Sequence, residues 1–587
     1  MSKDSRSGIR LHAIKIRCAA AIIALAVTGV SSARAQTTAP PTGSGPPTTI
    51  AGDHPDEAAN FLSGPEIAAS KTLRMQISLA LRNRDALENL IDAQQDPSSP
   101  QYHQWLAPGE FDARFGPTAA EVSTVAAWLT DKGFTVESAS VAKRAIVFSG
   151  AARSAESAFK VTIHTNLSGA LYANLGDPSV PASIAPLVGS IRGLSNILRS
   201  HPNIQYASRS SASPEATIAG VTGFGPNDIY TFYDQTPPTS AGNNGAGADC
   251  IAVIEDSDFD DSSVAAFDTQ FSLPAINLTR KFSSQGGDPF NSDETETLLD
   301  VEYAHAAAPG VPIFAYIGDS NTSSDSNGLV DAIMEAASDD TCGAISISFS
   351  FCGGAKKFYS HELNGFLKQA AAQGQAVFVA AGDRGAAGLS FDKSTNACIE
   401  GNTRNVNELS ADPYVTAIGG TEFSPNYSGG NDVGDVAETV WNDQTGATGG
   451  GNSRIFGKPK YQKGIRKIGS KRAVPDISLG ASPENPGFFL ASSGQVGCCI
   501  GGTSIAAPYW AGIAQLAAQR EGQRRIGNMN TALYAIYKSG GTGIRDVTQG
   551  SNSVAGIAGF SATIGYDRAS GLGTPDIDLL LGALAGQ

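Results

Sequence analysis

The sequence predicts an α/β protein whose main domain is a doubly wound parallel sheet, preceded by a small α+β domain. Over residues 219–587, short continuous apolar runs alternate with helical patterns. Such runs are typical of parallel strands that helices cover on both faces. Over residues 55–198, helical and strand-like patterns are mixed within the length of one small domain.

The composition is that of a large globular chain. Its 587 residues leave room for roughly three or four domains of about 150 residues. With 41% hydrophobic and 17% charged residues, the balance excludes a disordered chain, a coiled coil and a multi-span membrane protein. The net charge of −15 repels phosphate backbones, so we expect no nucleic-acid partner.

The first 35 residues have the three parts of a secretory signal peptide. Basic side chains precede the apolar run Cys18–Val30, and Ala33-Arg34-Ala35 follows it. A basic region, a short apolar core and an A-x-A end define such a peptide, and the run is too short to cross a bilayer. We expect cleavage near Ala35, a secreted (extracellular) product and no membrane partner. A buried helix of the mature fold is the less favoured alternative.

Three segments separate this peptide from the main domain. Residues 36–54 are rich in Pro, Gly and Thr and predict a flexible tether. Residues 55–198 form the small domain. Residues 199–218 are polar and predict a linker that a protease could cut.

Each predicted element rests on its own pattern. In the small domain, helices are predicted over Leu73–Ala93 and Ala119–Lys132, and strands at Ala145–Phe148 and Val161–His164. In the main domain, the predicted strands are Cys250–Ile254, Ile313–Ile317, Ala344–Ile347 and Ala376–Ala381, and the helices are Glu294–Ala308, Leu329–Ala337 and His361–Ala372. Chemistry in such sheets gathers at the carboxyl ends of the strands.

Cysteine usage agrees with export. Besides Cys18, the chain has an even set that suggests disulfides in many possible connectivities: Cys250, Cys342, Cys352, Cys398, Cys498 and Cys499. Cys342 and Cys352 are near enough in sequence to pair. We expect the neighbours Cys498 and Cys499 to reach different partners. The cysteine and histidine spacings fit no zinc site.

Ser504 is a candidate nucleophile. Gly501 and Gly502 precede it, and a helix with small residues follows, with Pro508 tolerable in its first turn. A serine at a helix N-terminus gains electrostatic help as negative charge develops. The alternative is a serine that merely caps the helix.

The base for this serine is predicted to be a carboxylate. Glu296 and Asp300 lie four residues apart and therefore on one helix face, where two ionised carboxylates repel and one is held protonated. A solvated acidic face is the alternative. A histidine base is also possible, because Asp256, His305 and Ser504 follow the subtilisin order. His305 lacks the glycine-rich context expected of such a base.

A third carboxyl group follows a buried strand. The run Ala376–Ala381 ends in Gly382-Asp383, which places the Asp383 side chain at the carboxyl edge of the sheet. An aspartate that only forms the turn is the alternative.

Together these motifs resemble the sedolisin (serine-carboxyl peptidase) family, with a pro-kumamolisin-like activation prodomain. The resemblance extends from about residue 55 to the end of the chain. Besides Gly502-Thr503-Ser504, Glu296/Asp300 and Gly382-Asp383, it rests on Asp96–Leu106, Phe111, Arg114–Gly116, Gly449–Ser453, Val474–Asp476 and Gly571–Pro575. It implies a subtilisin-like catalytic domain over residues 219–587, a prodomain over residues 55–198 and a processing region over residues 199–218.

The resemblance also implies a mechanism. Ser504 attacks the peptide carbonyl, Glu296 takes its proton, Asp300 orients Glu296, and protonated Asp383 donates to the oxyanion. Glu255 matches a carboxylate of the family's wider hydrogen-bond network. Because the base is a carboxylate, we expect an optimum at about pH 3–5.

A calcium loop is implied as well. Asp546, Val547, Thr563, Gly565 and Asp567 match the family's ligands for one structural Ca²⁺, through two carboxylates and three carbonyls. The partners implied are polypeptide substrates and the chain's own prodomain as inhibitor, and we expect a monomer.

The chain departs from the family pattern at its substrate-binding strand. Phe349 stands where a tryptophan is frequent and Ser350 where a glycine is frequent, so subsite specificity does not carry over. Two alternatives to a secreted serine-carboxyl endopeptidase stay open here: a subtilisin-type Ser/His/Asp peptidase and a catalytically inactive peptide-binding relative.

Overall fold

The computed structural model describes residues 45–207, 217–218, 221–283, 290–318, 328–425, 427–428, 431–432 and 436–586. The signal peptide, its cleavage site, residues 36–44 of the predicted tether and residues 208–216 of the predicted linker lie outside these ranges. Contacts group residues 42–587 into one compact unit. In the part of the chain that the structure describes, no helix combines the length and apolar character needed to cross a bilayer.

The small domain is built on an antiparallel sheet of order β3-β4-β2-β8. Its strands are β1 (Pro47–Thr49), β2 (Thr72–Leu79), β3 (Thr135–Ser140), β4 (Ala145–Ala151), β5 (Ile163–Thr165), β6 (Tyr172–Asn174), β7 (Ser179–Pro181) and β8 (Val188–Arg192). Its helices are α1 (Arg84–Gln94), α2 (Glu110–Phe115), α3 (Ala119–Asp131) and α4 (Ala152–Phe159). One apolar core joins α3 and α4 to the sheet.

One predicted helix of this domain is wrong in its first half. Residues Leu73–Leu79 belong to strand β2, in which Leu73, Met75 and Ile77 are buried and alternate with more exposed residues. That period of two is a strand pattern. The helix begins at Arg84. The predicted tether also holds strand β1, which pairs with β7.

The main domain holds a mostly parallel sheet of eight strands. Their order is β14 (Leu278–Phe282), β15 (Ile313–Ile317), β13 (Ile251–Glu255), β16 (Ala344–Ile347), β18 (Ala376–Ala380), β21 (Thr416–Glu422) and β24 (Thr439–Val440), with β27 (Ile477–Gly480) also on β21. Only the short β24 runs antiparallel to its neighbour in this described sheet.

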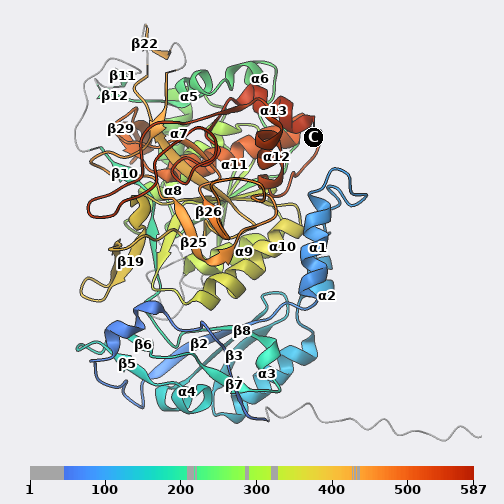
Figure 1. Cartoon of the computed structure of the whole chain (residues 1–587), viewed down its shortest axis with the longest axis vertical. Coiled ribbons are helices and arrows are strands. Elements are labelled where there is room, and N and C mark those ends of the chain that lie inside the picture. Colours follow the sequence, from blue (N-terminus) through green and yellow to red (C-terminus); the bar gives the residue numbers. More distant parts are fainter. Residues whose placement is uncertain are drawn as a thin grey trace, which may run out of the picture. The chain divides into compact units, whose positions relative to one another are not determined.

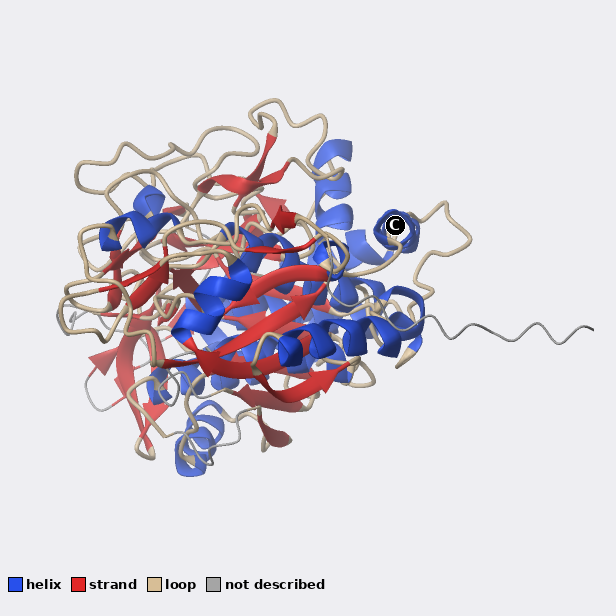
Figure 2. Cartoon of the chain, turned by 90° about the horizontal axis from the view of Figure 1, so that it is seen from below, coloured by secondary structure: helices blue, strands red, loops and turns tan. Residues whose placement is uncertain are grey.

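Helices cover both faces of this sheet. The helices of the main domain are α5 (Pro226–Phe232), α6 (Thr236–Ser240), α7 (Asp261–Phe271), α8 (Glu294–Ala307), α9 (Gly328–Asp339), α10 (Asn364–Ala372), α11 (Thr503–Arg520), α12 (Asn530–Ser539) and α13 (Ile577–Ala585). Ile251 and Val253 of β13 share a core with α8 and α11, whereas Ala252 and Ile254 share the other core with α9 and α10. Figure 1 labels α9 and α10 side by side, and Figure 2 separates helices from strands by colour. The predicted α/β, doubly wound architecture is confirmed.

Shorter strands complete the chain. They are β9 (Arg199–Pro202), β10 (Gln205–Tyr206), β11 (Thr217–Ile218), β12 (Val221–Thr222), β17 (Phe349–Cys352), β19 (Leu389–Asp392), β20 (Ala397–Glu400), β22 (Tyr427–Ser428), β23 (Asn431–Asp432), β25 (Gly451–Gly457), β26 (Lys471–Val474), β28 (Phe488–Ser492), β29 (Gln495–Gly501), β30 (Ile544–Arg545) and β31 (Thr574–Pro575).

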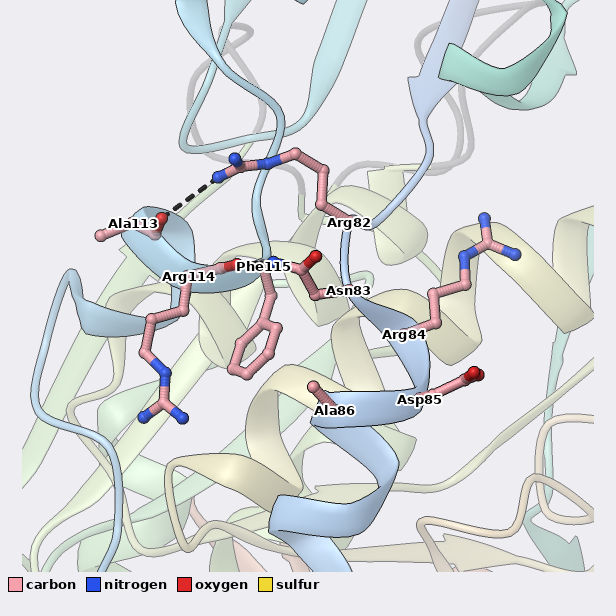
Figure 3. Close-up of a pocket in the computed structure, with 8 residues that line it drawn as sticks. All are labelled: Arg82, Asn83, Arg84, Asp85, Ala86, Ala113, Arg114 and Phe115. Atoms are coloured by element: carbon pink, nitrogen blue, oxygen red, sulfur yellow. Dashed lines mark hydrogen bonds between the residues drawn. The ribbon is translucent and has the colours of Figure 1, made fainter.

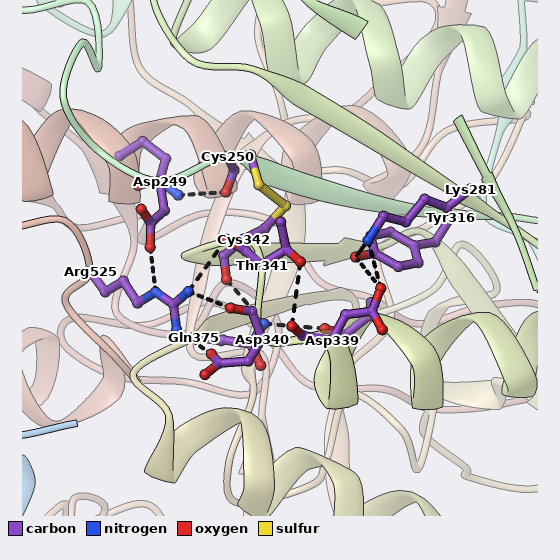
Figure 4. Close-up of a disulfide and its surroundings, with 12 residues drawn as sticks. Asp249, Cys250, Lys281, Tyr316, Asp339, Asp340, Thr341, Cys342, Gln375 and Arg525 are labelled. Atoms are coloured by element: carbon purple, nitrogen blue, oxygen red, sulfur yellow. Dashed lines mark hydrogen bonds and ion pairs between the residues drawn. A yellow bond between two sulfur atoms is a disulfide. The ribbon is translucent and has the colours of Figure 1, made fainter. Parts of the chain in front are cut away.

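The disulfides differ from the expected pairs. Cys250 pairs with Cys342, because both precede neighbouring parallel strands, β13 and β16 (Figure 4). Cys352, at the far end of β17, pairs with Cys398 of β20 instead of Cys342. Arg525 joins Asp249 and Asp340 beside the first bridge.

Cys498 and Cys499 pair with each other rather than with different partners. In β28, Phe488 lies opposite Ile500 and Phe489 opposite Cys498, so Cys499 is an extra residue in the ladder. Such a bulge breaks the alternation that would send neighbouring side chains to opposite faces.

Candidate active site

Ser504 lies in the first turn of α11, two residues after Gly502, a glycine that no other residue replaces easily. Gly502 has φ +113°, and a Cβ there would lie 2.1 Å from the carbonyl oxygen of Asn203 and 2.7 Å from Oδ2 of Asp383. The Ser504 side chain is fully buried. Its Oγ donates a hydrogen bond to Oε1 of Glu296 and lies 3.4 Å from the carbonyl oxygen of Ser348.

Glu296 and Asp300, the two predicted carboxyl groups of α8, each accept a hydrogen bond from a serine, Ser504 and Ser348 respectively. Glu296 contacts Ser504 directly, and Asp300 accepts a hydrogen bond of 2.7 Å at Oδ1 from Ser348 Oγ. Both side chains are buried, although the sequence alone also allowed a solvated acidic face. Their other oxygens, Oε2 of Glu296 and Oδ2 of Asp300, find no donor among the described residues. A buried carboxylate oxygen without a donor is costly, which favours a proton held on this pair.

The electrostatics of α8 and β13 agree with shared protons. Burial raises the pKa of Glu296 well above its ordinary value, and the nearby charge of Asp300 raises it further. Burial raises the pKa of Asp300 to about 8, against a lowering by its hydrogen bond from Ser348. Glu255, at the end of β13, is completely buried. This burial raises its pKa well above the ordinary value, and the nearby charge of Asp300 raises it further. The three groups titrate as one set.

Asp383 approaches from the opposite side, at the carboxyl end of β18. Its Oδ1 accepts hydrogen bonds from the Thr503 backbone N–H at 2.9 Å and from Thr503 Oγ1 at 2.8 Å. Gln205 Nε2 donates to its Oδ2 at 3.3 Å. Burial raises the pKa of Asp383 to about 6, and the bonds from Thr503 limit the rise.

The structure therefore brings Ser504, Glu296, Asp300 and Asp383 into one cluster, with Glu255 behind Asp300. Sequence reasoning missed Ser348, Thr503 and Gln205 as direct partners of these groups. Ser348 follows β16 and therefore lies at the same sheet edge as Asp383, which is the signal that could have found it. No local pattern around Gln205 indicates its bond to Asp383.

His305 does not reach the serine's hydrogen-bond partners. Its Nε2 bonds the carbonyl oxygen of Pro274 at 2.8 Å and lies 3.4 Å from Oδ1 of Asp268. It sits at the last turn of α8, and its ring is buried. In the described contacts, Ser504 Oγ meets a carboxylate instead of an imidazole.

The residues expected to bind calcium gather in one loop. Asp546 Oδ2 accepts from the Gly565 N–H at 2.7 Å, and Asp567 Oδ2 accepts from the Thr563 N–H at 2.8 Å. The carbonyl of Val547 lies 3.5 Å from Ser570 Oγ, which also bonds Asp567. Two carboxylates and neighbouring carbonyls form an all-oxygen donor set of the kind calcium takes. Among the described residues, no group of three or more His, Cys, Asp or Glu side chains is arranged to hold a metal ion, so this site depends on backbone carbonyls beside its two carboxylates.

A surface pocket of the small domain contains none of these residues. Arg82, Asn83, Arg84, Asp85, Ala86, Ala113, Arg114 and Phe115 line it, between α1 and α2 (Figure 3). Arg82 donates to the carbonyls of Gly116 and Ala113, so its guanidinium holds the α2 loop in place.

Comparison with known proteins agrees with this architecture. The model of the "Pro-kumamolisin, activation domain" family matches residues 59–197. Sedolisin of Pseudomonas sp. (strain 101) is 30% identical over 532 residues, which cover 87% of this chain and 87% of that protein. Kumamolisin of Bacillus sp. (strain MN-32) is 31% identical over 538 residues, covering 87% and 92%. Tripeptidyl-peptidase 1 of Homo sapiens is 24% identical, covering 87% and 91%.

A solved structure adds the fold. Pseudomonas sedolisin, described as a serine-carboxyl proteinase in complex with two molecules of pseudo-iodotyrostatin, aligns with a TM-score of 0.54 and 26% identity. It covers 62% of this chain and 99% of that one. Fold and relatives define the class of protein as a serine-carboxyl peptidase with an activation domain. The chain belongs to the sedolisin family, and its main domain has the subtilisin-like fold.

Proposed function

We propose that the chain is a secreted, acid-acting endopeptidase that hydrolyses peptide bonds through Ser504, Glu296, Asp300 and Asp383. The observation that carries the proposal is the hydrogen bond from Ser504 Oγ to Glu296 Oε1 in a fully buried site. A serine hydroxyl is a weak nucleophile until a neighbouring group accepts its proton. Here that acceptor is the Glu296 carboxyl group, whose ionised form the hydrogen bond from Ser504 favours against burial and the charge of Asp300.

The proton path follows from the hydrogen bonds. As Ser504 Oγ attacks a carbonyl carbon, its proton passes to Oε1 of Glu296. Asp300 lies near enough to Glu296 to raise its pKa, shares a hydrogen bond with Glu255 and accepts one from Ser348. Glu296 then returns the proton to the leaving amine. Glu255 is a third buried carboxyl group, next to Asp300, and it can share protons with Asp300 and Glu296.

Asp383 serves the oxyanion. Both hydrogen bonds from Thr503 reach Oδ1 of Asp383. The proton of the neutral carboxyl group is therefore on Oδ2, the oxygen that lies close to Gly502. Below a pKa of about 6 the carboxyl is protonated and donates to the oxyanion, and above it the ionised group repels that charge. Activity is therefore confined to acid.

Calcium has a structural part in this proposal. When bound, it would cross-link two segments that lie between α12 and α13 through the oxygens of Asp546, Val547, Thr563, Gly565 and Asp567. The hydrogen bonds of these calcium-loop residues do not include Ser504, Glu296, Asp300 or Asp383. We therefore propose that the ion acts on stability alone.

The small domain contacts the main domain and, in this proposal, restrains it. Lys368 of α10 pairs with Glu88 at 2.6 Å, and Leu106 N–H bonds the Ala372 carbonyl at 3.0 Å. Arg192 of the small domain lies 3.3 Å from Glu362 of the main domain. These contacts hold the small domain against the main domain.

The test is direct. The purified precursor is brought to about pH 4, where Asp383 is protonated, and is incubated with denatured protein. We expect the precursor to shorten and the denatured protein to be digested, with neither effect in Ser504→Ala. An unchanged precursor and intact substrate at every acid pH tested would refute the proposal.

A further inference from the structure

Residues 199–207 run past Ser504 as an extended chain that is paired on both sides of one peptide bond. Strand β9 pairs antiparallel with β17, with His201 opposite Ser350 and Pro202 opposite Phe349. Strand β10 pairs antiparallel with β29, with Gln205 opposite Gly501. Residues 203–204 lie between the two pairings. A protease holds its substrate in this way, by adding an extended peptide to strand edges.

The backbone of Asn203 is clamped beside the nucleophile. Its N–H donates to the Ser348 carbonyl at 3.0 Å, and its carbonyl accepts from the Ser504 N–H at 3.2 Å. That carbonyl also crowds the Cβ position of Gly502, next to Asp383 Oδ2. A carbonyl held by the nucleophile's own N–H and beside an acid donor stands where an oxyanion is stabilised.

We propose that Asn203–Ile204 is the bond that the enzyme cuts to mature itself, and that Ser350 selects an Asn-like side chain on the acyl side of the cut bond. The proposal rests on the function proposed above and adds its substrate preference. Within residues 199–207, the carbonyl that accepts the hydrogen bond from the Ser504 N–H is that of Asn203, and this contact singles out the Asn203–Ile204 bond.

The chemistry is an ordinary hydrolysis. Ser504 Oγ bonds to the Asn203 carbonyl carbon and gives its proton to Glu296. The bond from that carbon to the Ile204 nitrogen breaks, and the proton passes from Glu296 to this nitrogen. Water then attacks the acyl-enzyme, which frees Asn203 as a carboxylic acid and restores the Ser504 hydroxyl. One water is consumed and no oxidant or reductant is needed.

The side chain of Asn203 fills part of a pocket. It is 2% exposed, and its Oδ1 accepts a 3.0 Å hydrogen bond from Ser350 Oγ. Its Nδ2 has no partner among the described residues. Ser350, Gly382, Asp383, Arg384 and Asn407 belong to the wall of a small adjoining cavity. A hydroxyl donor at the wall favours a side chain with an acceptor oxygen over an apolar one.

The first experiment maps the cut. The full-length precursor is acidified, samples are taken early, and the released propeptide and the enzyme are measured by intact mass and terminal sequencing. The expected propeptide ends at Asn203 and the earliest enzyme form begins at Ile204. A propeptide that ends at another residue while denatured protein is digested overturns this inference alone. No cut and no digestion refute the proposed function as well.

The second experiment tests Ser350. Peptides spanning the linker sequence of residues 199–207 carry Asn or Leu at position 203, and kcat/KM is measured for each with the mature enzyme. We expect Asn to be preferred and Ser350→Ala to lower the Asn/Leu ratio about fivefold, the effect of one hydrogen bond. Ser539→Ala, at an exposed position of α12, should leave the ratio unchanged. Equal rates for both peptides in the wild type, or an unchanged ratio in Ser350→Ala, overturn the assignment.

Discussion

At the scale of single residues, Asp383 sets the upper pH limit of activity. Its pKa of about 6 comes from burial, and hydrogen bonds from Thr503 keep it from rising further. The protonated form donates, so activity falls as pH rises through about 6. Asp383→Asn keeps an N–H donor at every pH. We expect a lower maximal kcat/KM, by about tenfold to a hundredfold, and loss of the descending limb near pH 6 in a pH–rate profile.

The control for this prediction is Asp392→Asn, a change at a partly exposed position of β19 outside the cluster. It should keep the wild-type profile. If Asp383→Asn and the wild type lose activity over the same pH range, Asp383 is not the group that limits the reaction.

Gly502 is a second residue on which the site depends. A Cβ at this position would collide with the Asn203 carbonyl oxygen, and φ +113° is a conformation that other residues avoid. Gly502→Ala should therefore reduce kcat/KM at least about tenfold through displaced substrate and lower stability by about 1–2 kcal/mol. Gly457→Ala, where no atom lies within 4 Å of the added carbon, is the matched control. Kinetics on peptides and thermal melts measure both effects, and wild-type kinetics in Gly502→Ala would contradict the close approach.

At the scale of elements, the sequence predicts most of what positions the site. The strands β13, β15, β16 and β18 are continuous apolar runs between helices, and a fully buried strand needs no alternation to be found. Strand β2 was missed because its alternating pattern precedes a helix without a clear break. The bulge at Cys499 was missed because register depends on the partner strand.

The candidate site follows the same division. Glu296, Asp300, Asp383 and Ser504 stand in local motifs, so they could be predicted. The contacts of Asn203, Gln205 and Ser348 join segments far apart in the chain, and only the folded pairings bring them together. The family resemblance therefore implied roles for these four residues before the structure was known, whereas nothing in the sequence implied where residues 199–207 lie.

The calcium loop is an element with its own test. If Asp546 and Asp567 hold a structural ion, removal of calcium by a chelator should lower Tm, and added Ca²⁺ but not Mg²⁺ should restore it, because the loop offers carbonyls and carboxylates at calcium's larger spacing. Asp567→Ala should have a low Tm that Ca²⁺ no longer raises. Differential scanning calorimetry measures this, and a wild-type Tm indifferent to chelator and Ca²⁺ would exclude the site.

At the scale of the whole molecule, buried acids make stability depend on pH. Glu255 and Asp300 have raised pKa values in the folded chain, so their protonated forms are favoured by folding. That stability is fully present below their ordinary pKa values near 4 and is lost as pH rises through the folded values, which is about 8 for Asp300. The protein should be more stable in acid than near neutrality.

Glu255→Gln tests this dependence, because an amide of similar shape has no charge to bury. We expect Tm to rise by about 1–3 °C at pH 7 and to change little at pH 4. Glu400→Gln, at an exposed position of β20, serves as the control. Equal shifts of Tm at both pH values would mean that the buried charge does not decide the effect.

The central claim is that a carboxylate, and not an imidazole, takes the proton of Ser504. The most direct measurement is kcat/KM at about pH 4 for Glu296→Gln and His305→Gln, with each fold checked by circular dichroism. The account predicts a loss of about 10²–10⁴-fold for Glu296→Gln, the range of a general base, and at most a small loss for His305→Gln. A nearly normal Glu296→Gln together with an inactive, folded His305→Gln would contradict it.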